Sequence, residues 1–177
     1  MEERLKEDDE GRIERAEILR RWNVHNKTVL DIGVGPLAII AARDFNCTVM
    51  SIDVAEDKLQ EAERDVETEG LAAQITVEYG DATALWYPDR SFDVVISYGA
   101  LHHVAKESRK KFIQELRRVA KETVIIVELN ARGFKHIHEF DDFTPVDLDW
   151  LERAIHPLGA VEKYQGRLMN VYALSFW

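Results

Sequence analysis

Short apolar runs alternate with helical patterns along most of this chain of 177 residues. Five of the runs are rich in valine and isoleucine, and they occupy residues 28–31, 48–53, 74–79, 92–97 and 123–128. Strands of this kind are typical of a parallel sheet that helices cover on both faces, because both sides of each strand are then buried. The alternation therefore predicts an α/β fold around one central sheet.

Apolar residues at helical spacing predict helices at residues 2–22, 36–45, 55–69, 106–120 and 146–156. Pro36 fits the first turn of its helix, Gly70 follows the end of another, and Thr144 is a candidate N-cap ahead of Pro145. Two further strand-like runs, 161–166 and 170–176, are separated by only three residues. A parallel crossover needs a dozen residues or more, so these two strands are predicted to form an antiparallel hairpin.

The expected fold is thus a Rossmann-like, doubly wound sheet of seven mostly parallel strands, with a C-terminal antiparallel hairpin and helices on both faces. We expect a single domain, in which residues 1–26 form an N-terminal helix or lid and residues 27–177 form the Rossmann-like core. Cys47 is the single cysteine, which excludes both a disulfide framework and a cluster of thiolate metal ligands.

The chain has a formal net charge of −10 at pH 7. This charge disfavours binding to bulk nucleic acid, which depends on lysine and arginine contacts with phosphates. Basic residues do gather between positions 106 and 121, and we interpret them as a solvated helix face. The sequence shows no signal peptide and no apolar run near the roughly 20 residues that span a bilayer, so a cytoplasmic location without membrane contact is expected.

The first strand-like run ends in an acidic residue and breaks into a turn with two glycines, V-L-D-I-G-V-G-P-L, at residues 29–37. Glycine tolerates positive φ and has no Cβ, so a phosphate, carboxylate or ribose can approach the backbone there. Gly33, Gly35 and Ala38 also fit the loose G-x-G-x-x-G/A spacing of a dinucleotide site, with Asp53 about 20 residues further on as the ribose-binding carboxylate. Glycine spacing alone leaves the nucleotide-like ligand open.

Further motifs follow in order: S-I-D at residues 51–53, Y-G-D-A at 79–82, L-W-Y-P-D-R-S-F-D-V-V at 85–95 and A-L-H-H-V at 100–104. Together with the glycine turn, they resemble the class I S-adenosylmethionine-dependent methyltransferases, specifically the small UbiE-like group (methyltransferase types 11 and 25). The resemblance is strong over residues 29–104. Leu37 is a departure, because the family often has a third glycine at this position.

The resemblance implies S-adenosyl-L-methionine as cofactor and S-adenosyl-L-homocysteine as product. In the family pattern, Asp31 orients the turn and binds the ammonium group, and the two glycines admit the methionine end. Asp53 accepts hydrogen bonds from both ribose hydroxyls, and Asp81 accepts one from the adenine amino group. The cofactor-binding set that the resemblance implies is Asp31, Gly33, Gly35, Pro36, Asp53, Val54, Asp81, Ala82 and Ser97.

Methyl transfer is an in-line displacement at carbon, so it requires alignment, desolvation and, for some acceptors, removal of a proton. His103 is the first candidate for a general base, because histidine titrates in the useful range. Tyr98 and His102 are further catalytic candidates, since the family builds the floor of the acceptor pocket after this strand. Glu128 and Asn130 are second candidates for holding the acceptor.

Aromatic and polar residues are interleaved in residues 129–143, a pattern that suits either a lid over the acceptor or an Ω-like loop. The histidines and acidic residues at positions 136–142 are interpreted as surface groups. No metal ion is therefore expected, and displacement at a sulfonium does not require one.

The expected function is transfer of a methyl group from S-adenosylmethionine to an unidentified acceptor. A small molecule is the first choice of acceptor and a protein the second, and the sequence does not indicate an oligomeric state. Two alternatives stay open: a non-catalytic S-adenosylmethionine-binding subunit of a larger assembly, and an NAD-dependent oxidoreductase with the same glycine turn. Binding of S-adenosylhomocysteine without a response to NAD(H) would exclude the oxidoreductase.

Overall fold

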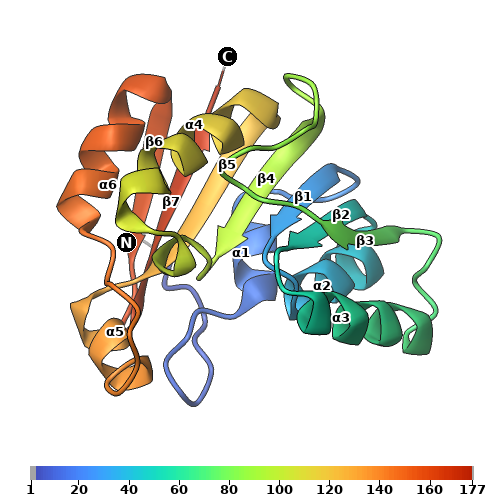
Figure 1. The fold of residues 1–177 in the computed structure, drawn as a ribbon, viewed down its shortest axis with the longest axis horizontal. Helices are drawn as coiled ribbons and strands as arrows, with labels where there is room; N and C mark the ends of the chain where they lie inside the picture. The colour runs from blue at the N-terminus through green and yellow to red at the C-terminus, as the bar shows by residue number, and fades with distance from the viewer. Residues whose placement is uncertain (1–2, 177) are drawn as a thin grey trace.

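The computed structural model describes residues 3–176 and contains one seven-stranded sheet, with strand order β3-β2-β1-β4-β5-β7-β6 (Figure 1). The strands are β1 (Thr28–Ile32), β2 (Thr48–Asp53), β3 (Ile75–Tyr79), β4 (Phe92–Tyr98), β5 (Ala120–Leu129), β6 (Ala160–Gln165) and β7 (Met169–Ser175). β1 to β5 are parallel, whereas β7 runs antiparallel to both β5 and β6. The predicted Rossmann-like sheet with its C-terminal hairpin is confirmed.

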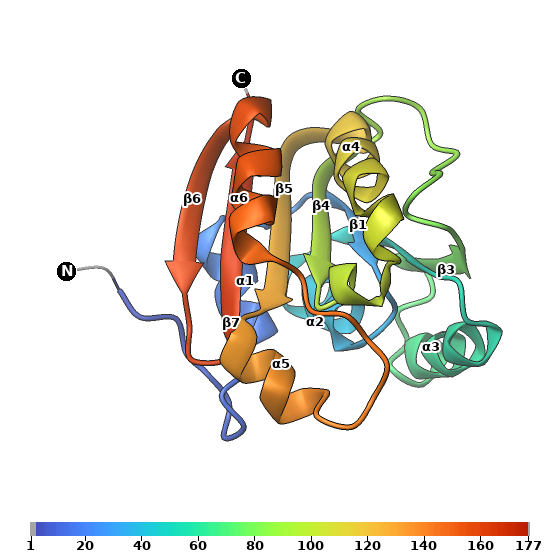
Figure 2. The ribbon, with the colours of Figure 1, turned by 60° about the vertical axis from the view of Figure 1, so that its left-hand side comes forward.

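Side chains of the central strands alternate between two apolar cores, one on each face of the sheet. Val29 packs in the core under α1 (Arg15–Arg21), α2 (Pro36–Phe45) and α3 (Glu56–Thr68). Leu30 packs in the opposite core, under α4 (Arg109–Val119) and α6 (Leu148–Ile155). Figure 2 shows α4 and α6 on one side of the sheet and α1 and α2 on the other. Both faces are buried, which explains why the strands read as continuous apolar runs.

The predicted N-terminal helix at residues 2–22 is wrong over most of its length, because only α1 is helical; Glu2 lies outside the described residues. Asp8 Oδ1 accepts hydrogen bonds from the amides of Glu10 and Arg12, and Gly11 adopts φ +88°. These contacts form a turn that brings Glu7 into a β-bridge with Ile13. An aspartate side chain that bonds nearby amides offers the backbone an alternative to the helix, and here that alternative prevails.

The segment at residues 129–143 contains a helix that the sequence analysis did not predict, α5 (Ala131–Ile137). Asn130 caps it by accepting a hydrogen bond from the Gly133 amide and donates through its own side chain to the Gly166 and Arg167 carbonyls. A Cβ at Gly133 would lie 2.0 Å from the Leu168 carbonyl oxygen. Glycine therefore lets α5 pack against the turn between β6 and β7.

The last helix, α6, begins later than predicted, and its N-cap is Asp147 instead of Thr144. The Asp147 side chain accepts a hydrogen bond from the Trp150 amide at 3.1 Å. The predicted helix at 106–120 is a short 3₁₀ turn, η2 (Lys106–Ser108), followed by α4. Among the described residues, none of the helices has both the length and the apolar character needed to cross a bilayer.

Candidate functional site

A cavity of about 650 Å³ lies at the carboxyl ends of β1, β2 and β4, where open α/β sheets bind their ligands. Its lining includes seven residues singled out from the sequence: Gly33, Asp53, Val54, Asp81, Ala82, Tyr98 and His103. Seven others lie outside that lining: Asp31, Gly35, Pro36, Ser97, His102, Glu128 and Asn130. Of these, Gly35 and Pro36 border a neighbouring cavity of about 630 Å³ between α2 and α3.

The turn after β1 is held by its backbone. Gly33 adopts φ +87°, and its amide donates a 2.8 Å hydrogen bond to the Ile52 carbonyl at the end of β2. A Cβ at Gly33 would make only an ordinary 3.6 Å contact, so the left-handed conformation is what requires glycine. Gly35 has extended backbone and open space beside its Cα. Leu37, at the position of the family's third glycine, is 2% exposed and packs in the core.

Asp53 ends β2 with both of its carboxylate oxygens oriented by backbone amides. The Val34 amide donates to Oδ2 at 3.2 Å, and the Ala55 amide donates to Oδ1 at 3.0 Å. Each carboxylate oxygen has a further lone pair available to a hydroxyl group. A ligand with two adjacent hydroxyls therefore finds a fixed pair of acceptors on the cavity wall.

Asp81 and Ala82 line the cavity after β3. Asp81 Oδ1 accepts hydrogen bonds from the Thr83 amide at 2.8 Å and from the Thr83 hydroxyl at 2.7 Å. This turn fixes the carboxylate and leaves Oδ2 without a hydrogen-bond partner among the described residues. The arrangement offers an acceptor to an exocyclic amino group.

Asp31 is 1% exposed and lies behind the glycine turn, where Ser51 Oγ donates to its Oδ2 at 2.9 Å. Burial raises the pKa of Asp31 to about 7, and the charge of Asp53 adds to the shift. The Ser51 hydrogen bond and the positive charge of Arg15 act in the opposite direction on that pKa. Asp31 is thus a buried acid that can influence a ligand at the turn through its charge.

Ser97 lies on β4, beside Ile32 of β1, and is fully buried. Its hydroxyl has no hydrogen-bond partner among the described residues. Most buried polar groups have hydrogen-bond partners, so this hydroxyl is available to bind a water molecule or a ligand.

Tyr98 lines the cavity and also holds the N-terminal segment. Its hydroxyl donates a 2.7 Å hydrogen bond to the Ile13 carbonyl, and the Arg15 guanidinium lies over its ring at 4.2 Å. Burial raises the pKa of Tyr98, which keeps the hydroxyl protonated for that bond. The geometry gives this catalytic candidate an anchoring contact.

Replacing Tyr98 with phenylalanine is expected to destabilise the protein by about 1 kcal/mol, the typical net value of one hydrogen bond. Amide hydrogen exchange in residues 12–16 should become faster, because the Ile13 carbonyl loses its donor. Tyr79→Phe is the matched control, since the Tyr79 side chain is mostly exposed. Equal exchange rates in all three proteins would show that the hydroxyl does not anchor the segment.

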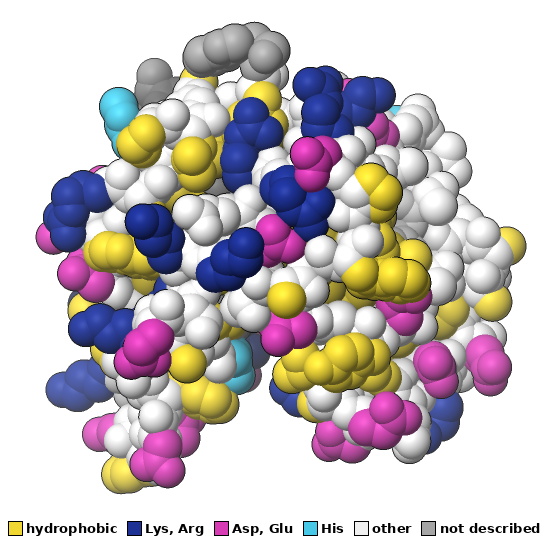
Figure 3. Space-filling view, turned by 45° about the horizontal axis from the view of Figure 1, so that its top comes forward, with side chains coloured by type: hydrophobic (Ala, Val, Ile, Leu, Met, Phe, Trp, Pro, Cys, Tyr) yellow, Lys and Arg dark blue, Asp and Glu magenta, His cyan; other side chains and the backbone are white. Residues whose placement is uncertain are grey.

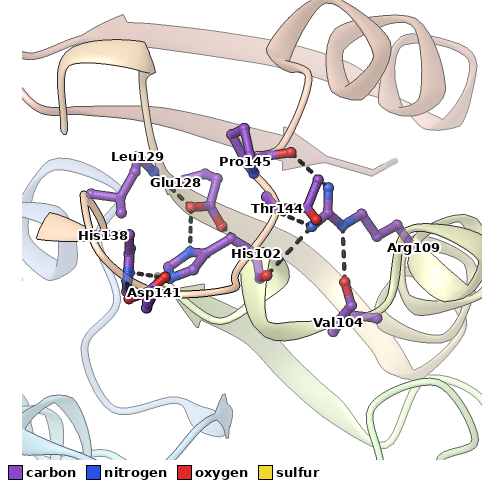
Figure 4. Close-up of polar contacts among 9 residues, drawn as sticks. All are labelled: His102, Val104, Arg109, Glu128, Leu129, His138, Asp141, Thr144 and Pro145. Carbon is purple, nitrogen blue, oxygen red and sulfur yellow. Dashed lines mark hydrogen bonds and ion pairs between the residues drawn. The ribbon is translucent and has the colours of Figure 1, made fainter. Parts of the chain in front are cut away.

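His102 belongs to a chain of polar contacts that starts at a buried carboxylate (Figure 4). Glu128, on β5, lies 2.7 Å from His102 Nδ1 through Oε1 and accepts the His102 amide at 3.2 Å through Oε2. His102 Nε2 lies 3.0 Å from His138 Nε2, and His138 Nδ1 contacts Asp141. Figure 4 shows this chain joining β5 to the turn after β4 and to the loop after α5.

His103 follows His102 and faces the cavity. Partial burial, with positive charge on neighbouring groups, lowers the pKa of His103 to about 4, so the imidazole is neutral at pH 7. Phe143 packs edge-on against His103, with ring centroids 4.3 Å apart. The loop after α5 therefore places an aromatic ring beside His103.

Arg109 holds this loop in place (Figure 4). The guanidinium is buried and donates to the Thr144 and Pro145 carbonyls at 2.7 and 2.9 Å, and to the Val104 carbonyl at 3.0 Å. This basic residue was interpreted as part of a solvated helix face, which is wrong for Arg109. Figure 3 shows basic side chains gathered in the part of the surface where α4 lies, interspersed with acidic ones.

Three further residues join the site in the structure. Lys58, on α3, lines the cavity, and Arg15 lies close enough to Asp31 to lower its pKa. His138 reaches His102 from a segment 36 residues away. The H-x-H pattern was the available signal for His138, but sequence alone cannot show that a loop histidine folds back onto the turn after β4.

The chain matches the family model described as "Methyltransferase domain" over residues 29–123. An uncharacterized protein of Haemophilus influenzae is 36% identical over 54% of this chain and 39% of its own length. The 2-methyl-6-phytyl-1,4-hydroquinone methyltransferase of Synechocystis is 31% identical over 73% of this chain and 41% of its own length. The chain thus spans about two fifths of the length of these curated relatives.

The fold also matches solved structures. Magnesium protoporphyrin IX methyltransferase from Synechocystis, solved with bound SAH, aligns with a TM-score of 0.73 at 18% sequence identity, covering 92% of this chain and 80% of that one. This similarity supports the fold, while the family match covers more than half of the chain, including the glycine turn, Asp53, Asp81 and the two adjacent histidines. The chain belongs to the methyltransferase-domain family.

Proposed function

We propose that this chain is an S-adenosylmethionine-dependent methyltransferase that acts on a small-molecule acceptor. The observation that carries the proposal is the geometry of Asp53, whose two oxygens are fixed by the Val34 and Ala55 amides on the cavity wall. This carboxylate suits the vicinal hydroxyls of a ribose.

The residues around the cavity fit the other parts of the cofactor. Gly33 exposes backbone after β1, and Asp81 presents a carboxylate after β3, about where the two ends of a nucleoside-like ligand held by Asp53 would lie. The cavity of about 650 Å³ is within the range of small-molecule sites. Asp31 places negative charge behind the turn, which suits a cationic ligand, and the Ser97 hydroxyl is a free polar group nearby.

When bound, S-adenosylmethionine supplies a methyl carbon on a sulfonium, which an acceptor lone pair attacks while the carbon–sulfur electron pair returns to sulfur. The chain then has to hold the two reactants in line and exclude water. Asp53 and Asp81 hold the nucleoside side of the cavity. Tyr98, His103 and Phe143 line the side next to β4 and the loop after α5, which we assign to the acceptor.

A small acceptor suits this arrangement, because the loop after α5 places Phe143 on that side of the cavity. Phe143 packs edge-on against His103, and Arg109 ties the loop to the turn after β4 through the Thr144 and Pro145 carbonyls. The relative described as 2-methyl-6-phytyl-1,4-hydroquinone methyltransferase is named for a small-molecule substrate, which supports a small molecule over a protein as acceptor class.

Isothermal titration calorimetry with S-adenosylhomocysteine tests the cofactor assignment. Asp53→Ala is expected to weaken binding by about 1–3 kcal/mol through the lost charge-assisted hydrogen bonds. Asp57→Ala is the matched control, because Asp57 is an exposed aspartate on the next helix and should leave the affinity unchanged.

Two outcomes would contradict the proposal. Equal affinity in Asp53→Ala and the wild-type protein would show that the ribose does not bind at Asp53. Binding of NAD(H) without binding of S-adenosylhomocysteine would favour an oxidoreductase. If S-adenosylhomocysteine binds but mass spectrometry detects no methyl transfer to any small molecule or protein of a cell extract, the chain is a binding subunit.

A further inference from the structure

Three histidine side chains converge where the cavity meets the loop after α5. They are His102 and His103, in η1 (Leu101–His103), and His138, which directly follows α5. Each residue offers one ring nitrogen, and these three nitrogen atoms all lie within 4.8 Å of one another. His103 also lines the cavity, so one side of the cluster is open to a ligand there.

The hydrogen bonds of His102 and His138 determine what their other nitrogens can do. Glu128 lies 2.7 Å from His102 Nδ1, and Asp141 contacts His138 Nδ1 (Figure 4). A carboxylate accepts a hydrogen bond, so Nδ1 is the donor in each ring, and the lone pair of the neutral form of each ring then lies on Nε2. These two Nε2 atoms face each other at 3.0 Å. Two lone pairs at that distance repel each other unless a cation lies between or beside them.

Charge and coordination geometry both favour a divalent ion as that cation. Two carboxylates, of Glu128 and Asp141, lie beside the three imidazoles, and their charge complements that of one divalent ion. Tetrahedral zinc binds histidine nitrogens at about 2.0–2.1 Å, which places neighbouring ligand nitrogens roughly 3.4 Å apart. The pair at 3.0 Å is close to that spacing, and the exposed His103 ring can rotate toward it. Metal-bound histidines usually donate their other N–H to a carboxylate, as His102 and His138 do.

We propose that His102, His103 and His138 bind a divalent transition metal ion, with Zn²⁺ as the best match, and that Glu128 and Asp141 orient two of the three ligands. Three histidines leave a fourth position, which is the pattern of catalytic zinc sites. His103 places that position beside the cavity. This proposal replaces the sequence-based expectation that no metal is bound.

The role of the ion rests on the proposed function. An acceptor hydroxyl or thiol at the fourth position would bind the ion and release its proton to solvent, because a metal-bound X–H group is more acidic than a free one. No electron is transferred in this step, and the resulting anion keeps the lone pair that attacks the methyl carbon. The acceptor class is therefore a small molecule with an ionisable oxygen or sulfur atom.

Metal binding is tested on untagged protein that has been treated with a chelator and then titrated with Zn²⁺ or Co²⁺ alone. We expect one Zn²⁺ per chain by elemental analysis, and the intense visible absorption of tetrahedral Co²⁺. His138→Ala and His103→Ala should each weaken Zn²⁺ binding at least about 100-fold, and Asp141→Asn should weaken it about 10- to 100-fold. His103 is exposed, so its replacement leaves the fold intact even if another variant unfolds.

His136→Ala is the matched control, because His136 is an exposed histidine of α5 that lies outside the cluster. It should bind Zn²⁺ like the wild-type protein. The proposal is overturned if the wild-type chain binds no ion, if only octahedral Co²⁺ is seen, or if His103→Ala and His138→Ala bind Zn²⁺ as the control does. The absence of any bound ion would mean that the two Nε2 atoms share a proton.

Calorimetry with S-adenosylhomocysteine separates failure of this proposal from failure of the proposed function. Chelator-treated protein that binds S-adenosylhomocysteine but no Zn²⁺ would overturn the metal site and leave the cofactor site standing. Protein that binds Zn²⁺ but not S-adenosylhomocysteine would overturn the cofactor site and leave the metal site standing.

Discussion

Glu128→Ala is expected to lower the free energy of unfolding by about 3–5 kcal/mol, the cost of removing one partner from a buried polar pair. Glu128 is fully buried and contacts three nitrogens: His102 Nδ1 at 2.7 Å, the His102 amide at 3.2 Å and the Leu129 amide at 2.7 Å. Alanine leaves these groups without an acceptor in a region closed to water. Urea unfolding measures the effect, with a chelator present so that metal binding does not contribute.

Glu122→Ala is the matched control on the same strand. The Glu122 side chain is 43% exposed and pairs with Lys27 near the surface, so its loss should cost less than about 1 kcal/mol. Glu128→Gln keeps the size of the side chain and one acceptor oxygen, and it should fall between the two. A loss in Glu128→Ala no larger than that in Glu122→Ala would show that the His102 contact contributes little to stability.

Local patterns predicted most of the sheet, because a strand that is buried on both faces has a continuous run of apolar residues. β2 has the predicted bounds, Thr48–Asp53, and so does α2, Pro36–Phe45, where the proline begins the helix. The antiparallel pairing of the C-terminal hairpin followed from the length of the connection, since the gap between its two strands is too short for a parallel crossover.

Errors occurred where a side chain competes with the backbone. At the N-terminus, Asp8 accepts two amides and turns the chain, although Leu5 and Ile13 fit a helical pattern. At α6, Asp147 is the N-cap, three residues after the expected Thr144. Aspartate and threonine both cap helices, so sequence alone does not rank two nearby candidates.

The candidate site likewise has a part that the sequence predicted and a part that it did not. Residues at or just beyond the carboxyl ends of strands, such as Asp53 and Asp81, could be placed on one cavity from strand order, because parallel strands end at one edge. The contact between His102 and His138 depends on how the loop after α5 folds back, and Arg109 fixes that loop through backbone carbonyls. Carbonyl partners have no sequence signature, so this half of the site could not be predicted.

Asp31→Asn is expected to stabilise the protein at pH 8, and the gain should shrink as the pH falls. Burial raises the pKa of Asp31 from 3.8 to about 7, so between these values the folded state binds more protons than the unfolded state. Stability from this group is therefore lost as pH rises from about 4 through 7. Asparagine does not titrate, and its advantage over aspartate should grow by about 2–3 kcal/mol between pH 5 and pH 8. Urea unfolding at the two pH values measures this change.

Asp44→Asn is the control for a change of charge, since Asp44 is exposed on α2 and the hydrogen bond from Arg43 holds its pKa below the ordinary value, so its charge does not change between the two pH values. A difference between Asp31→Asn and wild type that is the same at both pH values would contradict the assignment. If the cofactor's ammonium draws on the Asp31 charge, the same variant should bind S-adenosylhomocysteine more weakly at pH 8, although it is more stable. A variant that is more stable but binds S-adenosylhomocysteine more weakly would show that the buried acid serves binding. Functional sites often contain groups that lower the stability of the fold. Stability gained with unchanged affinity would limit Asp31 to orienting the turn through Ser51.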